Sequence, residues 1–174
     1  MAGKIQINSI TNANIYLNGS SLLGRAEEIK MPDITAMMTE RKALGMVGKI
    51  ELPTGFDKLE GEIKWNSLYE DAAVVTANPF TAVQLQCRSS IETFSSQGRV
   101  EEVAMVTYLT VMFKKNPLGA FKQHDPAEFT TNFSATYLKQ VINGREIIEL
   151  DYMANIFRVD GQDMLANYRS NIGG

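Results

Sequence analysis

The chain has 174 residues, of which 44% are hydrophobic and 21% are charged, and its formal net charge is −3 at pH 7. This size and composition predict one globular domain, residues 1–174, that buries its own core. The balance of 17 basic and 20 acidic residues excludes a strongly basic nucleic-acid-binding module, which needs clustered Lys and Arg. With one His and one Cys, the chain has neither an intrachain disulfide nor a zinc site made of those ligands alone. We expect no metal and no cofactor.

The N-terminal sequence lacks the apolar segment of a signal peptide. The longest uncharged stretch, residues 72–87, is too short and too polar to span a bilayer. We therefore expect a soluble protein of a reducing compartment that does not insert into a membrane by itself.

An unusual segment lies at about residues 31–55, after a short strand and an Asn18-Gly19 turn. It combines four methionines with the charged run 40–42 and several Gly and Pro residues. We predict an extended hairpin arm that projects from the domain and reaches a neighbouring subunit. Exposed methionines suit an adaptable contact surface, although on composition alone the favoured interpretation is that they fill gaps in the core.

Residues 56–65 alternate between apolar and charged side chains, as in a strand with one solvent-exposed face. Leu59, Ile63 and Trp65 share the apolar face. The opposite face carries Lys58, Glu60, Glu62 and Lys64.

The next elements are a helix and several strands. Ser67 and Glu70 form a capping-box pattern, which predicts a helix from that point to Asn78-Pro79. Residues 103–113 are apolar on both faces, so this strand should be covered on both sides, by a helix or by another subunit.

The C-terminal third begins with a strong hairpin signal, Asn143-Gly144, between residues 129–142 and 145–150. A second helix is predicted from about residue 161 or 162 to residue 170. The chain is thus mainly β (α+β): a β-barrel or sandwich subunit with one flanking helix, the arm and a short C-terminal helix.

No motif predicts catalysis. His124-Asp125 precedes Pro126 and is typical of a surface turn, and Cys87 lies in an apolar strand where a structural role is favoured. Carboxylate pairs occur, but at a frequency expected on any acidic surface. We expect no catalytic residues and no enzyme.

The order of several short motifs resembles the major tail tube proteins of contractile-tailed bacteriophages and the related R-type pyocin tubes. The C-terminal third is the most similar, with a hairpin of the form Asp-Gly-(Lys/Arg)-Glu-(Leu/Val)-x-Glu-Ile-Asp. The segments that carry the resemblance are 12–19, 31–34, 39–46, 59–65, 141–151, 158–165 and 168–173.

The resemblance implies a structural subunit of the virion. Six copies would form a ring, and rings would stack into a hollow tube inside a contractile sheath, which serves as a conduit for DNA ejection into the host. The implied partners are other copies of the chain, the sheath protein, the tape measure protein, and the baseplate hub and tail terminator proteins. DNA would pass through without specific binding, and the host cytoplasm would hold the subunit during assembly.

Two sets of residues are then candidates for function. If the strand at 56–65 lines the channel, the lumen-facing candidates are Lys58, Glu60, Glu62 and Lys64, with Glu101 and Glu102 from the strand that approaches Val103. The subunit-interface candidates, from the arm and the C-terminal stretch 168–174, are Met37, Glu40, Arg41, Met46, Leu52, Arg169 and Asn171.

The alternative from another class is a small β-barrel that binds a ligand or acts as a hydrolase through a carboxylate pair. It predicts a stable monomer with a pocket of convergent polar groups and perturbed carboxylates.

Overall fold

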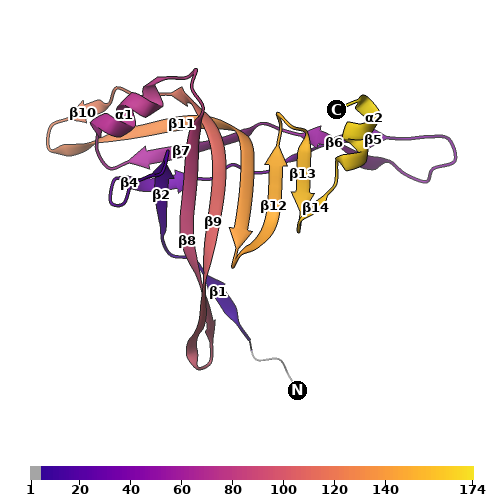
Figure 1. Ribbon diagram of the computed structural model, residues 1–174, viewed down its shortest axis with the longest axis horizontal. Helices are drawn as coiled ribbons and strands as arrows, with labels where there is room; N and C mark the ends of the chain where they lie inside the picture. The colour runs from indigo at the N-terminus through magenta and orange to yellow at the C-terminus, as the bar shows by residue number, and fades with distance from the viewer. Residues whose placement is uncertain (1–4) are drawn as a thin grey trace.

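The computed structural model describes residues 5–174, and most of its elements are β-strands (Figure 1). In chain order these elements are β1 (Ile7–Ser9), β2 (Ala13–Leu17), β3 (Ser20–Ser21), β4 (Ala26–Lys30), β5 (Ala36–Arg41), β6 (Ile50–Phe56), β7 (Leu59–Trp65), α1 (Glu70–Ala77), β8 (Val83–Ser95), β9 (Gly98–Lys115), β10 (Ala120–Lys122), β11 (Asp125–Ile142), β12 (Arg145–Asp151), β13 (Ile156–Val159), β14 (Gln162–Asp163) and α2 (Ala166–Ile172).

The main sheet is antiparallel and open. Its strands follow the order β14-β13-β12-β11-β9-β8-β2-β3, with β1 added to β8, β10 and β7 to β11, and β4 to β7. Within residues 5–174 the two ends of this order do not pair, so the sheet is not a closed barrel. The mainly-β fold with a flanking helix, a hairpin arm and a C-terminal helix is confirmed.

Strand β11 divides one of its edges between two partners. Residues Phe129 to Ala135 pair with β7, and residues Tyr137 to Ile142 pair with β12, while the other edge pairs with β9. The register with β9 shifts between Ala135 and Tyr137, where the partner changes. Such an irregularity bends a strand, so the sheet forks at this point.

The core spans this fork, because the buried cluster includes residues of β7 as well as Leu138 of β11 and Leu150 of β12. Leu59 and Ile63 of β7 are fully buried there with Leu85 of β8 and Leu109 of β9. The Phe113 and Phe133 rings meet edge to face, with centroids 6.1 Å apart. Non-sequential strands thus share one apolar cluster, which supplies the main driving force for folding.

The predicted alternation of β7 is confirmed, because its odd-numbered residues are buried and its even-numbered residues only half-buried. Trp65 also donates an indole hydrogen bond to the Thr131 hydroxyl, 3.0 Å away. The strand begins at Leu59 rather than residue 56 because Phe56 ends β6 and packs against Phe157, with ring centroids 4.7 Å apart.

The two-residue turns are confirmed by the backbone. Asn143 and Gly144 have φ angles of 50° and 76°, the left-handed pair that a type I′ hairpin requires. Asn18 and Gly19 adopt the same conformation between β2 and β3.

Both helices begin later than the sequence predicts. Helix α1 starts at Glu70 with Tyr69 as its N-cap, which makes no side-chain capping bond, so the capping box at Ser67 is wrong. Helix α2 starts at Ala166. The residues before it form β14, which pairs back on β13 across another left-handed turn, Asp160-Gly161.

Strands β5 and β6 form a separate two-stranded sheet that extends away from the main sheet in Figure 1. Three arm methionines, Met37, Met38 and Met46, are 41–48% exposed. Only Met31, which precedes β5, packs against the core. Core filling by the arm methionines is therefore wrong, because a two-stranded hairpin has no second layer to cover them.

None of the helices within residues 5–174 has the length and apolar character needed to cross a membrane.

Gly61 is the position of β7 where a side chain is excluded. A Cβ there would lie 2.4 Å from the Phe133 ring and 2.5 Å from the Lys30 carbonyl oxygen. We predict that Gly61→Ala lowers the free energy of unfolding by about 2 kcal/mol or more, because backbone and ring must both shift. Gly48→Ala in the arm, where a Cβ meets nothing within 4 Å, is the matched control and should change stability by less than about 0.5 kcal/mol in urea titrations. Equal losses of unfolding free energy in the two variants would contradict the steric exclusion of a side chain at Gly61.

Candidate assembly surfaces

The solvent side of β7 carries a cluster of paired charges, which we call the β7 charged face. Its defining residues are Lys58, Glu60, Glu62 and Lys64, with Glu27, Lys114 and Glu128 in contact with them. Glu60 accepts from Lys114 and from Lys58, and these bonds lower the pKa of its carboxyl group. Glu62 accepts a 3.2 Å hydrogen bond from the Asn132 amide.

Lys64 is shared by two carboxylates, Glu27 at 3.5 Å and Glu128 at 3.6 Å. The nearby negative charges of Glu128 and Glu27 raise the pKa of its ammonium group. Three lysines and four glutamates give this face a net charge of −1. The structure therefore brings all four β7 candidates together on one slightly acidic surface.

The other two lumen candidates lie elsewhere. Glu101 and Glu102 belong to the ribbon of β8 and β9, where they pair with Thr93 and Glu92. Glu102 accepts from the Ser90 hydroxyl at 2.8 Å and pairs with Arg99 at 3.4 Å. Lys114 is twelve residues further along β9, which is about 40 Å in an extended strand. Glu101 and Glu102 are thus not part of the β7 charged face.

Sequence reasoning missed Lys114, although strand alternation from the buried Phe113 would have placed it opposite the core. It also missed Glu27 and Glu128, since only the pairing of β4 and β11 with β7 brings them beside Lys64. The alternation signal is local, whereas these contacts depend on strand order.

The outer face of β9 is only partly covered. Leu109, Val111 and Phe113 are buried on the core side, whereas Tyr108 is half-buried and Met112 is 37% exposed on the other. The described residues of the single chain therefore leave part of this second face open to solvent.

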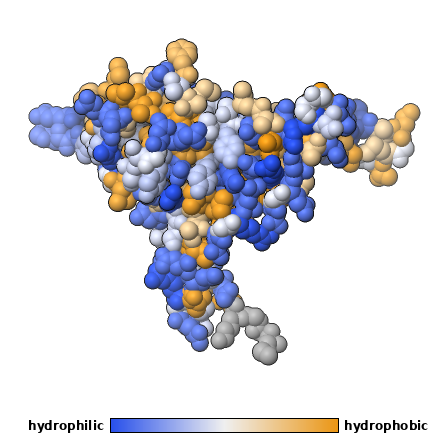
Figure 2. Space-filling view, in the orientation of Figure 1, coloured by the Kyte–Doolittle hydropathy of each residue, from blue (hydrophilic) through white to orange (hydrophobic). Residues whose placement is uncertain are grey.

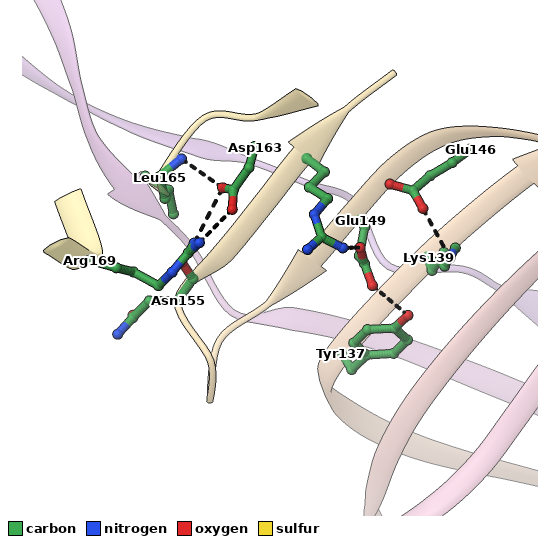
Figure 3. A network of polar contacts seen from close by, with 9 residues as sticks. Tyr137, Lys139, Glu146, Glu149, Asn155, Asp163, Leu165 and Arg169 are labelled. Carbon is green, nitrogen blue, oxygen red and sulfur yellow. Dashed lines mark hydrogen bonds and ion pairs between the residues drawn. The ribbon is translucent and has the colours of Figure 1, made fainter. Parts of the chain in front are cut away.

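A polar network ties β11, β12 and β13 together (Figure 3). Glu149 is only 8% exposed and accepts from the Tyr137 hydroxyl at 2.9 Å and from Arg158 at 2.6 Å. Burial raises the pKa of Tyr137, and the hydrogen bond to Glu149 raises it further. Beside it, Lys139 pairs with Glu146 at 2.9 Å. These bonds fix the sheet end from which the C-terminal segment continues.

The arm candidates Met37, Met46 and Leu52 are each 41–47% exposed. Glu40 pairs with Lys49 across the hairpin at 2.9 Å, and Arg41 lies exposed at the end of β5. The structure therefore gathers the five arm residues on one projecting hairpin.

The two C-terminal candidates differ from each other. Arg169 is held within its own subunit by Asp163, with contacts of 2.5 and 3.3 Å, and it also donates to the Asn155 carbonyl (Figure 3). This pair lowers the pKa of Asp163. Asn171 is exposed on α2. Arg169 thus serves the packing of α2 on β13 and β14.

The described carboxylates with resolved pKa shifts are all shifted downwards by cationic partners: Glu60 by Lys114, Asp71 by Arg25, Asp160 by Arg145 and Asp163 by Arg169. A general acid needs the opposite shift. Burial raises the pKa of the Cys87 thiol, which disfavours the reactive thiolate. The resolved pKa shifts therefore do not support the hydrolase alternative.

The described residues thus combine an open sheet, a projecting hairpin and a charged strand face. The family model of phage tail tube protein FII matches residues 7–173. The chain therefore belongs to the family of phage tail tube proteins FII.

Individual relatives agree with this assignment. The tail tube protein of Escherichia phage P2 is 26% identical over 161 residues, which cover 92% of this chain and 94% of that protein. A chain of the extended sheath–tube complex of PVC, an extracellular contractile injection system, shares the fold with a TM-score of 0.55 and 11% identity, covering 74% and 87% of the two chains. A chain of the extended PVC sheath/tube terminator structure gives the same score at 9% identity, covering 74% and 92%.

We predict that Arg158→Ala lowers the free energy of unfolding by about 1–3 kcal/mol, because it leaves the buried Glu149 carboxylate without its cation. Arg145→Ala is the control. Arg145 also pairs with a carboxylate, Asp160, at 2.6 Å, but both side chains are more than half exposed, and such pairs contribute less than about 1 kcal/mol. Thermal and urea unfolding of both variants measure the difference, and an Arg145→Ala effect as large as that of Arg158→Ala would disprove the assignment.

Proposed function

We propose that this chain is the tube subunit of a contractile phage tail. Six copies form a ring, and stacked rings form a hollow tube inside the sheath that conducts DNA into the host cell. The observation that carries the proposal is the family match over residues 7–173. The full-length similarity to the P2 tail tube protein and the fold shared with PVC sheath–tube chains support it.

The proposed partners follow from this position in the tail. The subunit contacts other copies and the sheath along the tube, the tape measure protein during length determination, and the baseplate hub and tail terminator proteins at the two ends. Its role is structural rather than catalytic. It is made in the host cytoplasm and ends in the virion, where DNA passes without specific binding.

Two surfaces of the subunit support the proposal that it assembles into a tube. The projecting β5–β6 arm is a surface that one chain cannot cover, and the outer face of β9 is only partly covered. An interface that repeats from copy to copy without closing produces a filament, whereas one that closes by rotation produces a ring. We propose that both kinds of contact are present.

The direct test is assembly of the purified chain. Rings or tubes with a central channel in negative-stain electron microscopy are expected, if necessary after nucleation by the baseplate hub. A protein that stays monomeric at high concentration with nucleating hub present would contradict the proposal.

The arm is predicted to be needed for polymerisation but not for folding. Deleting Arg41 to Thr54 removes most of a hairpin that is separate from the main sheet, so the variant should keep a cooperative unfolding transition and its circular dichroism signal of β-structure. It should form no tubes in electron micrographs. A deletion in the β10–β11 turn, residues 123–124, serves as the control. Tubes from the arm deletion would show that the contact lies elsewhere.

The β7 charged face is predicted to line the channel, where its slightly acidic character repels phosphate and lets DNA slide. Glu60→Lys with Glu62→Lys should slow or block DNA ejection, because cationic phosphate contacts add affinity. The defect should be larger at low salt, where screening is weak.

The paired substitutions Glu60→Gln and Glu62→Gln are the neutral control, with a smaller effect expected. Folding should change little in either case, since exposed charge pairs contribute about 1 kcal/mol or less. Ejection from virions with intact tubes is measured by DNA release. Normal DNA release from the lysine variant would show that β7 does not line the channel.

A further inference from the structure

A groove lies between the base of the arm and the C-terminal helix. Its volume is about 800 Å³, and it is lined by β5–β6 residues such as Phe56, by Ile156 and Phe157 of β13, and by Leu165 and Tyr168 at α2. These apolar side chains are only half-buried or exposed in the subunit. The groove therefore offers an apolar surface that the chain itself leaves unfilled.

The tip of the arm carries the complementary feature. Leu44 and Val47 lie in the connection between β5 and β6, and each is fully exposed. The connection turns through Gly45, whose φ is +84°, and the Met46 amide donates to the Ala43 carbonyl at 3.2 Å. Two apolar side chains are thus held at the end of a projecting hairpin, and the outer end of this projection is partly coloured as hydrophobic in Figure 2.

The charges beside the two features are opposite. Arg41 and Lys42 flank the tip, and neither forms an ion pair among the described residues, since the cross-hairpin pair uses Lys49 and Glu40. Asp151 lines the groove, and Asp57 lies close enough to groove residue Tyr152 to raise the pKa of its hydroxyl, after burial as the larger cause. Neither aspartate has a Lys or Arg partner among the described residues.

Tip and groove belong to the same chain and lie at opposite ends of one hairpin, because Ala36 and Phe56 at its base line the groove. A contact between them in two copies is therefore heterologous, because each subunit gives its tip to one neighbour and its groove to another. Such a contact propagates from copy to copy, as a stacked tube requires.

We propose that the occupant of this groove is the arm tip of a second copy of the chain, with Leu44 and Val47 inserted among the apolar side chains and Arg41 and Lys42 beside Asp57 and Asp151. This inference rests on the proposed tube function and names the receiving surface for the arm.

Cross-linking tests the contact directly in assembled tubes. Cys87, the only native cysteine, is 8% exposed, so an introduced surface thiol is the reactive one. Val47→Cys and Tyr168→Cys are made as separate variants, co-assembled into tubes, and treated with a short bismaleimide. Covalent dimers on a denaturing gel are expected, and each variant assembled alone should stay monomeric.

Val47→Cys with Phe80→Cys is the matched control pair, because Phe80 is 92% exposed but lies in the loop after α1. Intact tubes that give no dimer with Tyr168→Cys, or as much dimer with Phe80→Cys, would overturn the inference while leaving the tube function intact. Failure of the unmodified chain to form tubes would instead overturn the proposed function.

Removing the apolar groups tests the same contact by affinity. Leu44→Ser with Val47→Ser should raise the protein concentration needed for tube formation by about 100-fold or more, since two apolar side chains lose their burial. The control, Leu118→Ser with Val74→Ser, removes exposed residues near α1 and β10 and should cause a much smaller shift. Equal shifts in the two double variants would overturn the inference.

Discussion

A strand edge can hydrogen-bond to one neighbour at each position, and in this subunit one edge of β11 serves two. The first half of that edge holds β7, and the second half holds β12. This division sets the positions of the surfaces on which assembly is proposed to depend. The β7 charged face follows from the first half, and the polar network, α2 and the groove follow from the second.

The arm leaves and rejoins the main sheet between neighbouring strands. The chain enters the arm from β4 and leaves it into β7, which are neighbours in the sheet. Strands β5 and β6 lie between them in the chain and pair only with each other, so the hairpin is not part of the main sheet. A two-stranded hairpin buries little on its own, which is why we propose that the arm packs against another copy of the chain.

The sequence predicted those features that depend on neighbouring residues. The alternation of β7 and the Asn143-Gly144 turn were correct because side-chain period and turn geometry are local. The start of α1 was wrong, because Tyr69 rather than Ser67 is its N-cap and makes no side-chain capping bond. The C-terminal helix was predicted to begin too early, because residues 162–163 form β14, a strand that exists only through its pairing with β13.

The candidate sites show the same limit. The four β7 charges could be placed on one face from spacing alone, whereas Glu101 and Glu102 lie far along β9 from them. Likewise, the ion-pair partner of Arg169, a subunit-interface candidate, is Asp163 of its own chain, which spacing alone did not identify. Partners separated in sequence become visible only when the strand order is known.

The order in which the strands are synthesised has a consequence for when assembly can begin. Trp65 of β7 is paired with Phe129, so at about 5–20 residues per second a nascent chain waits several seconds between making the two partners. Until β11 leaves the ribosome, β7 has only β4 beside it, and β12 has not yet been made. The groove that we propose as the receiving surface is lined by β13 and α2, so it can form only after the C-terminal third of the chain has been made.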